Sequence, residues 1–136
     1  MINRLTDTLA FHGQALSLRS ERQRLIASNI ANADTPGYVA RDMDFARALR
    51  EATGQAQAVA PAATQARHLA VAGGARAEPQ LLYTRPAQDN LDHNSVDMDR
   101  ERAAFADNTV KYEATLRFIN AQARTMLDAM KSHNQG

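Results

Sequence analysis

The sequence predicts a mainly α-helical protein in which long N- and C-terminal helices pair as a coiled coil around a weakly structured middle. The N-terminal stretch lacks proline up to Pro36 and contains one glycine before it, apolar residues recur every seven positions near the C-terminus, and the segment between is rich in alanine. Only 5% of the 136 residues are aromatic, and 27 are alanine, the residue of highest helix propensity. This composition favours close helix contacts over a bulky core.

The first helix is predicted from about Ile2 to Ala31. Because an α-helix has 3.6 residues per turn, its apolar residues fall on two separate sides. An ordinary amphipathic helix has one apolar face, so two faces predict a helix that other segments contact from two sides. One stripe comprises Leu5, Leu9, Leu16, Ala27 and Ile30, and the other comprises Phe11, Leu18 and Leu25.

The last helix is predicted from about Val96 to Lys131, with Asn94 or Ser95 as its N-terminal cap. Acidic residues in its first turn and basic residues in its last suit the helix dipole. An uninterrupted seven-residue repeat runs through it, which is typical of a coiled coil. The repeat comprises Met98, Phe105, Tyr112, Ile119 and Met126, and its companions four residues on are Arg102, Thr109, Leu116, Ala123 and Met130.

The middle of the chain is predicted to be largely extended or mobile until a partner covers it, because it lacks the apolar content to fold alone. Asp42 to Glu51 can form a short helix through Met43, Phe45 and Leu49, and Leu81–Tyr83 is the one plausible strand. We therefore expect one structural unit with three segments. These are 1–39, the first helix and a turn; 40–93, the irregular middle; and 94–136, the heptad helix.

Several function classes find no support in the residues. The absence of cysteine excludes disulfides, thiolate metal sites and cysteine nucleophiles. A net charge of +1 gives no global field for nucleic acid or a membrane, and no apolar run is long enough to span a bilayer. The N-terminal residues do not have the pattern of a cleaved secretory signal. Histidines are scattered and no nucleotide or hydrolase motif occurs, so we predict no catalytic residue, no cofactor and no metal.

Two charged clusters admit a second interpretation. The acidic residues from Asp89 to Asp99 could suggest calcium, but they lack the alternating ligands and central glycine of an EF-hand loop, and the helix-cap interpretation is favoured. The basic cluster from Arg19 to Arg24 is interrupted by Glu21 and has no interleaved aromatic residues. A solvated helix face is favoured there over nucleic-acid contact.

The segment from Ser28 to Tyr38 predicts a helix stop followed by a tight turn. Pro36 disfavours helical dihedral angles at Thr35, and Thr35-Pro36-Gly37-Tyr38 fits a type II turn with Gly37 at positive φ. The side chains of Asn29, Asn32 and Asp34 can bond backbone groups at the helix end, and Tyr38 can fold back on the helix.

The whole string resembles the N-terminal signature ANxxTPGY of the bacterial flagellar axial proteins, which form the rod and hook. The matching residues are Ala31, Asn32, Thr35, Pro36, Gly37 and Tyr38. Within that superfamily the chain resembles a short proximal rod protein, through the residues after the turn, 38–45, and those that open the last helix, 94–101. His93 departs from the family, which has glycine there in an Asp-Gly-Asn turn; Asn94 tolerates left-handed angles, so an altered turn can form.

The resemblance implies a structural subunit, not an enzyme, that polymerises through its terminal helices into the basal-body rod and transmits motor torque. It implies export through the flagellar type III apparatus without a cleaved signal, self-association, and contacts with other rod proteins and with ring and export-gate components at the rod base. Two alternatives stay open: the sibling proximal rod protein, whose GGPYRR and PNV segments do not occur here, and a helical adaptor or export chaperone that does not polymerise.

Two groups of residues are expected to carry assembly. The assembly motif comprises Asn29, Ala31, Asn32, Thr35, Pro36, Gly37 and Tyr38. The helix-packing or subunit-interface residues are Leu5, Leu9, Leu16, Leu18, Leu25, Ile30, Met98, Phe105, Tyr112, Leu116, Ile119 and Met126.

Overall fold

The computed structural model describes residues 2–54, 81–83 and 93–136 and is mainly helical, as the composition predicted. Its elements are α1 (Ile2–Ala31), β1 (Arg41–Met43), α2 (Phe45–Ala52), β2 (Leu81–Tyr83) and α3 (Met98–Asn134). In this part of the chain, no helix combines the length and apolar character needed to cross a bilayer. Most of the alanine-rich segment expected to be extended lies outside the described residues.

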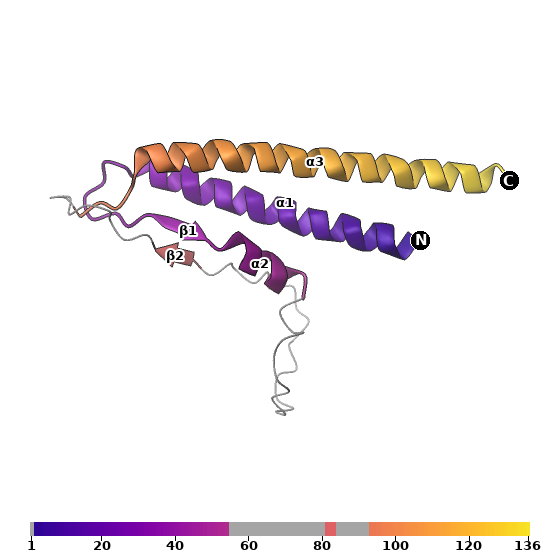
Figure 1. The fold of residues 1–136 in the computed structure, drawn as a ribbon, viewed down its shortest axis with the longest axis horizontal. Coiled ribbons are helices and arrows are strands. Elements are labelled where there is room, and N and C mark those ends of the chain that lie inside the picture. The colour runs from indigo at the N-terminus through magenta and orange to yellow at the C-terminus, as the bar shows by residue number, and fades with distance from the viewer. Residues whose placement is uncertain (1, 55–80, 84–92) are drawn as a thin grey trace, which may run out of the picture.

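The two long helices lie side by side and run in opposite directions (Figure 1). Contacts along their interface are Asn29 with Glu101, Gln23 with Thr109, and His12 with Phe118. Since the residue number falls on one helix as it rises on the other, these contacts fix a single antiparallel register. The predicted pairing of the terminal helices is therefore confirmed.

The helix α3 continues beyond the start of α1. From the contact between His12 and Phe118, α1 has 10 more residues to Ile2 (12 − 2), whereas α3 has 16 more to Asn134 (134 − 118). The last six residues of α3, 129–134, thus extend past α1 by roughly 9 Å at 1.5 Å per residue. Figure 1 shows this projecting end, which we call the C-terminal overhang.

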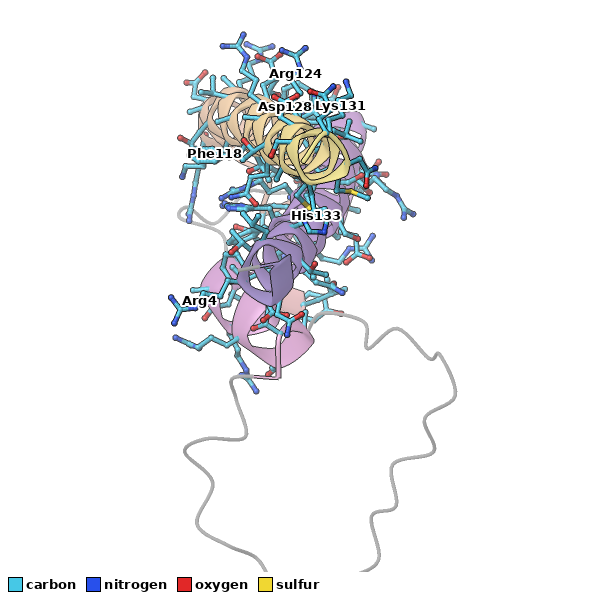
Figure 2. All side chains as sticks on the ribbon, turned by 90° about the vertical axis from the view of Figure 1, so that its right-hand side faces the viewer. Arg4, Phe118, Arg124, Asp128, Lys131 and His133 are labelled. Atoms are coloured by element: carbon cyan, nitrogen blue, oxygen red, sulfur yellow. The ribbon has the colours of Figure 1, made fainter. Side chains whose placement is uncertain are left out.

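A second layer covers another side of α1. Leu18 is buried with Met43 of β1 and Ala48 of α2, and three partly buried side chains pack against them: Leu25, Phe45 and Leu49. Figure 2, a view along the helix pair, shows α1 between α3 and α2. The two apolar stripes of α1 therefore correspond to two contacted sides, since Leu18 and Leu25 face this layer and not α3.

The middle of the chain contributes a two-stranded antiparallel sheet, with Met43 opposite Leu81. The strand at Leu81–Tyr83 was predicted, but β1 was not. Because Met43 belongs to β1, the short helix begins later than expected, at Phe45, with Asp44 as its N-cap accepting from the Arg47 amide.

The cap predicted for the last helix is wrong. The helix begins at Met98, and the Asp97 carboxylate caps it by accepting from the amides of Asp99 and Arg100. Asn94 and Ser95 precede the helix and are buried, because they bind the end of α1 and the chain that follows it, as described below.

The companion series predicted for the coiled-coil seam faces α1 only in part, since Thr109 and Ala123 are half-buried and Thr109 accepts from Gln23 of α1. The other buried or half-buried positions on α3 include the Met98 repeat apart from the exposed Phe105, and residues three positions on from that repeat: Glu101, Asn108, Thr115 and Gln122. Arg102, Leu116 and Met130 of the predicted series are exposed instead. The two predicted series still lie close together on the helix surface, but α1 covers only one edge of that surface.

Candidate assembly interface

The turn after α1 has the predicted geometry. The Tyr38 amide donates to the Thr35 carbonyl at 3.2 Å, and Gly37 has a φ of 73°. An added Cβ at Gly37 would meet no atom within 4 Å, so backbone conformation and not space requires glycine there. Proline and glycine together thus direct the chain sharply out of α1.

Asn29 joins the turn, β1 and α3. Its amide nitrogen donates to the Arg41 carbonyl at 2.7 Å and to the Glu101 carboxylate at 3.1 Å, and its oxygen accepts from the Arg41 amide at 3.0 Å and the Tyr38 hydroxyl at 3.2 Å. The side chain is 1% exposed, and all its bonding capacity is used. Asn29 was expected to bond the helix end; it instead pairs with the Arg41 backbone as a neighbouring strand would. The Tyr38 hydroxyl also lies 3.2 Å from that of Ser28, so Tyr38 folds back on α1 as expected.

Asn94 binds the turn that follows α1. Its amide nitrogen lies 2.7–2.9 Å from the carbonyls of Asn32, Ala33 and Thr35, and its oxygen accepts from the Val96 amide. These three carbonyls lie beyond the last residue of α1, in the turn that follows it, and the buried Asn94 amide satisfies them. The end of the helix itself is bonded locally, because the Asn32 side chain donates to the Ser28 carbonyl at 2.8 Å, as expected.

Ser95, just before α3, is hydrogen-bonded to the chain that follows the turn. Its hydroxyl accepts from the Ala40 amide at 2.8 Å, and its own amide donates to the Tyr38 carbonyl at 3.0 Å. His93, two residues earlier, has a φ of 54°. The left-handed residue is thus His93 and not Asn94, at the position where the flagellar family has glycine.

Glu101, in the first turn of α3, accepts a hydrogen bond from the buried Asn29 side chain. Burial raises its pKa, the hydrogen bond from Asn29 opposes that rise, and the nearby Asp42 adds to it. A raised pKa means that the folded state favours the neutral acid more than water does. The ionised form of Glu101 is therefore less favourable in the folded protein than in the unfolded chain.

A polar layer lies halfway along the helix pair. Asn108 is fully buried and donates to the Arg19 carbonyl at 2.9 Å and the Gln23 side chain at 2.7 Å, while Gln23 donates to Thr109. The Asn108 side-chain oxygen has no partner among the described residues. A buried asparagine in a helix seam fixes register at some cost in stability.

Apolar side chains remain uncovered along α3. Phe105, Leu116 and Leu127 are spaced by eleven residues, close to three helical turns, so they form a nearly straight row along the helix. They are 40%, 40% and 56% exposed, and Met130 beside them is 61% exposed. We call these four residues the outer apolar row. Figure 2 places Arg124 and Asp128 on the side of α3 away from α1, so a charged face borders the row.

The expected interface residues divide between the interior and this surface. Those of α1 are buried or half-buried: Leu5, Leu9, Leu16, Leu18, Leu25 and Ile30. Half-buried in α3 are Met98, Tyr112, Ile119 and Met126, whereas Phe105 and Leu116 are exposed. Of the assembly motif, Asn29 is buried, Asn32 and Tyr38 are half-buried, and Ala31, Thr35, Pro36 and Gly37 are exposed. Sequence reasoning did not assign Glu101 and Asn108 to the contact between α1 and α3; their seven-residue spacing was the signal that could have done so.

Nothing in the described part of the chain suggests catalysis. No group of three or more histidine, aspartate or glutamate side chains there could hold a metal ion. A depression of about 290 Å³ beside β1 has a mixed lining that includes Glu21, Arg24 and Ser28.

Comparison with known proteins gives a consistent result. Residues 9–38 match the family described as flagella basal body rod protein. The chain is 46% identical to the flagellar basal body rod protein FlgB of Proteus mirabilis strain HI4320, over 96% of this chain and 98% of the relative. It is 44% identical to that of Salmonella typhimurium strain LT2 and 41% identical to that of Escherichia coli K12, each over 98% of this chain and 100% of the relative. The chain therefore belongs to the FlgB family of flagellar basal-body rod proteins.

Proposed function

We infer that this chain is a structural subunit of the bacterial flagellar basal-body rod, and we propose that it assembles through the surface of its paired terminal helices. The outer apolar row carries this proposal, because it lies on a long rigid helix and no described part of the chain covers it. Exposed apolar patches of this kind mark protein–protein contact sites. Heterologous contacts that do not close generate a helical filament, which suits a rod.

Within this proposal, segments 1–39 and 94–136 form the assembly unit, and segment 40–93 is an accessory to it. The hydrogen bonds of Asn29 and Asn94 support the division, since they connect the first and last segments directly. The proposed neighbours are other rod proteins and the ring and export-gate components at the rod base. Export through the flagellar type III apparatus and a periplasmic position follow from the family resemblance.

The proposal is tested by complementing a strain that lacks its own rod subunit of this family. The wild-type chain should restore swimming and be found in purified basal bodies. Leu116→Asp should reduce incorporation strongly, because it places a carboxylate in an interface that must lose water. Val110→Asp is the matched control: Val110 is 66% exposed on the same helix but lies about 120° around from Leu116.

Circular dichroism separates assembly from folding in this experiment. Both aspartate variants should keep the helix content and melting temperature of the wild type, since both positions are exposed. Absence of the wild-type chain from basal bodies would contradict the function itself. Equal incorporation of the two variants would show instead that the outer apolar row is not the assembly surface.

A further inference from the structure

The depression beside β1 combines an apolar surface with charged groups. It lies between α1 and the small sheet, and the apolar part of its lining comprises Leu25, Met43 and Leu81. Met43 and Leu81 are opposite each other in the sheet, and Leu25 packs against the cluster around the buried Met43. Its volume of about 290 Å³ is at the small end of the range for ligand pockets. We call it the sheet pocket.

Two arginines give the sheet pocket positive charge. Arg24 comes from α1 and Arg41 from β1, and neither makes an ion pair with any residue that the structure describes. The Arg41 guanidinium lies 6.0 Å from the centre of the Tyr38 ring, a contact that leaves its N–H groups available to a carboxylate. Glu21 also lines the pocket but is already engaged in an interaction of its own. The described lining therefore carries a net positive charge beside an apolar surface.

The Ser28 hydroxyl adds a hydrogen-bond acceptor to the pocket. The Tyr38 hydroxyl has one hydrogen, which it donates to the Asn29 side-chain oxygen at 3.2 Å. The contact of 3.2 Å between the hydroxyls of Ser28 and Tyr38 must therefore use the hydrogen of Ser28. Since that hydrogen is committed, the Ser28 oxygen can only accept from a ligand, and a backbone amide is a suitable donor.

We propose that the sheet pocket binds the C-terminal residue of a partner protein whose chain ends in an apolar side chain. The terminal carboxylate pairs with Arg24 and Arg41, and the amide of the same residue donates to Ser28. Its side chain packs against the three apolar residues of the lining. Arginine forms its strongest hydrogen bonds with carboxylates, and terminal carboxylates are a recurring target of recognition.

The size of the pocket favours a chain end over an internal acidic residue. A C-terminal residue carries the carboxylate, the apolar side chain and the amide on one α-carbon, so all three fit a small pocket together. An internal aspartate or glutamate has its carboxylate on the side chain, and a second residue must then supply the apolar group. The site goes beyond the rod function and does not depend on it.

N-acetyl-L-leucine is the probe, because it has the amide, side chain and carboxylate of such a chain end. Titrated into the ¹⁵N-labelled full chain, it should shift the backbone amide signals of the pocket residues saturably in NMR spectra. Three analogues each lack one group: N-acetyl-L-leucinamide the charge, N-acetylglycine the side chain, and 4-methylpentanoate the amide. Each should bind about fivefold or more weakly. No saturable shift with N-acetyl-L-leucine, or an analogue that binds as tightly, would overturn the proposal.

Substituting the arginines provides a second test. Arg24→Gln and Arg41→Gln should each weaken binding of N-acetyl-L-leucine about fivefold or more. Arg124→Gln makes the same change of charge on the side of α3 away from α1 (Figure 2) and should bind like the wild type. The dipeptide N-acetyl-Leu-Asp-amide, whose one carboxylate is on a side chain, should bind more weakly than N-acetyl-L-leucine. Unchanged binding in both pocket variants, equal weakening in Arg124→Gln, or tighter binding of the dipeptide would overturn the proposal. The rod function would stand in each case, because incorporation into basal bodies tests it separately.

Discussion

His93 has an unusual backbone angle in the segment that leads into α3. Its φ of 54° is in the left-handed region, where a side chain costs about 1–2 kcal/mol relative to the right-handed one. The hydrogen bonds of Asn94 and Ser95 hold the chain in this conformation on the C-terminal side. The strain is thus local, and it is offset by bonds made by the next two residues.

Replacing His93 by glycine should stabilise the protein. Glycine removes the left-handed penalty but adds backbone entropy to the unfolded chain, so the net gain is about 0.5–1 kcal/mol. His93→Ala is the control, because it removes the imidazole and keeps the Cβ. Urea denaturation followed by circular dichroism measures both, and equal stabilities of the two variants would show that the angle is not strained.

Glu101 makes stability depend on pH in a direction opposite to that of most carboxylates. Its pKa is raised in the folded state, so the folded protein binds more protons than the unfolded chain between the two pKa values. Its contribution is therefore fully present below about pH 4.5 and is lost as the pH rises through the folded pKa. Asp42 and Asp97 add to the rise, and Arg100 opposes it.

Glu101→Gln should remove this part of the pH dependence. Glutamine keeps an oxygen that accepts from Asn29 and carries no charge that burial can penalise. The free energy of unfolding at pH 7 should equal or exceed that of the wild type, and its decline from pH 4.5 to pH 7 should be smaller. Glu113→Gln, on an exposed position of α3, controls for the change in net charge. An unchanged decline in Glu101→Gln would disprove the assignment.

At the scale of elements, the features that depend on neighbouring residues in the chain were predicted from the sequence. The bounds of α1, the turn at Gly37 and the strand at Leu81–Tyr83 follow from helix propensity, proline, glycine and apolar runs. The polar seam through Asn108 did not follow, because a heptad count locates apolar residues without saying whether they face the same subunit or another. Asn94 was misassigned for a related reason: its partners are some sixty residues away.

The polar layer at Asn108 should specify register more than stability. Asn108→Leu removes a buried oxygen that has no partner among the described residues, but it also removes the donor to the Gln23 side chain, so the opposing effects should leave the free energy of unfolding within about 1–2 kcal/mol of the wild type. Asn120→Leu, on an exposed position of the same helix, should have little effect. Urea denaturation measures both variants, and a large loss of stability in Asn108→Leu would contradict this role.

The effect on register needs a separate measurement. Because the chain has no cysteine, spin labels can be attached to Ala10→Cys on α1 and Ala121→Cys on α3 without background. With Asn108 the distance distribution between them should be narrow, and with Asn108→Leu it should broaden, since no buried polar group selects one alignment. A distribution equally narrow in both proteins would show that other contacts fix the register.

For the whole molecule, the structure separates an inner seam from an outer surface. The inner seam is partly polar and holds α1 against α3, and the exposed apolar side chains lie outside it. In the proposed assembly, burial of each further apolar side chain on this outer surface is worth about 1.5–3 kcal/mol.

The bond between Ala40 and Ser95 has a consequence for how such a protein can change in length. Ala40 lies where the chain leaves the helix pair, and Ser95 lies where it returns. The hydrogen bond between them therefore holds together the two ends of the intervening segment. Lengthening a loop whose ends are fixed costs little, about 0.6 kcal/mol for each doubling. The chain should therefore tolerate insertions between residues 54 and 81, because the hydrogen bonds of Asn29, Asn94 and Ser95 hold the helix pair without that segment.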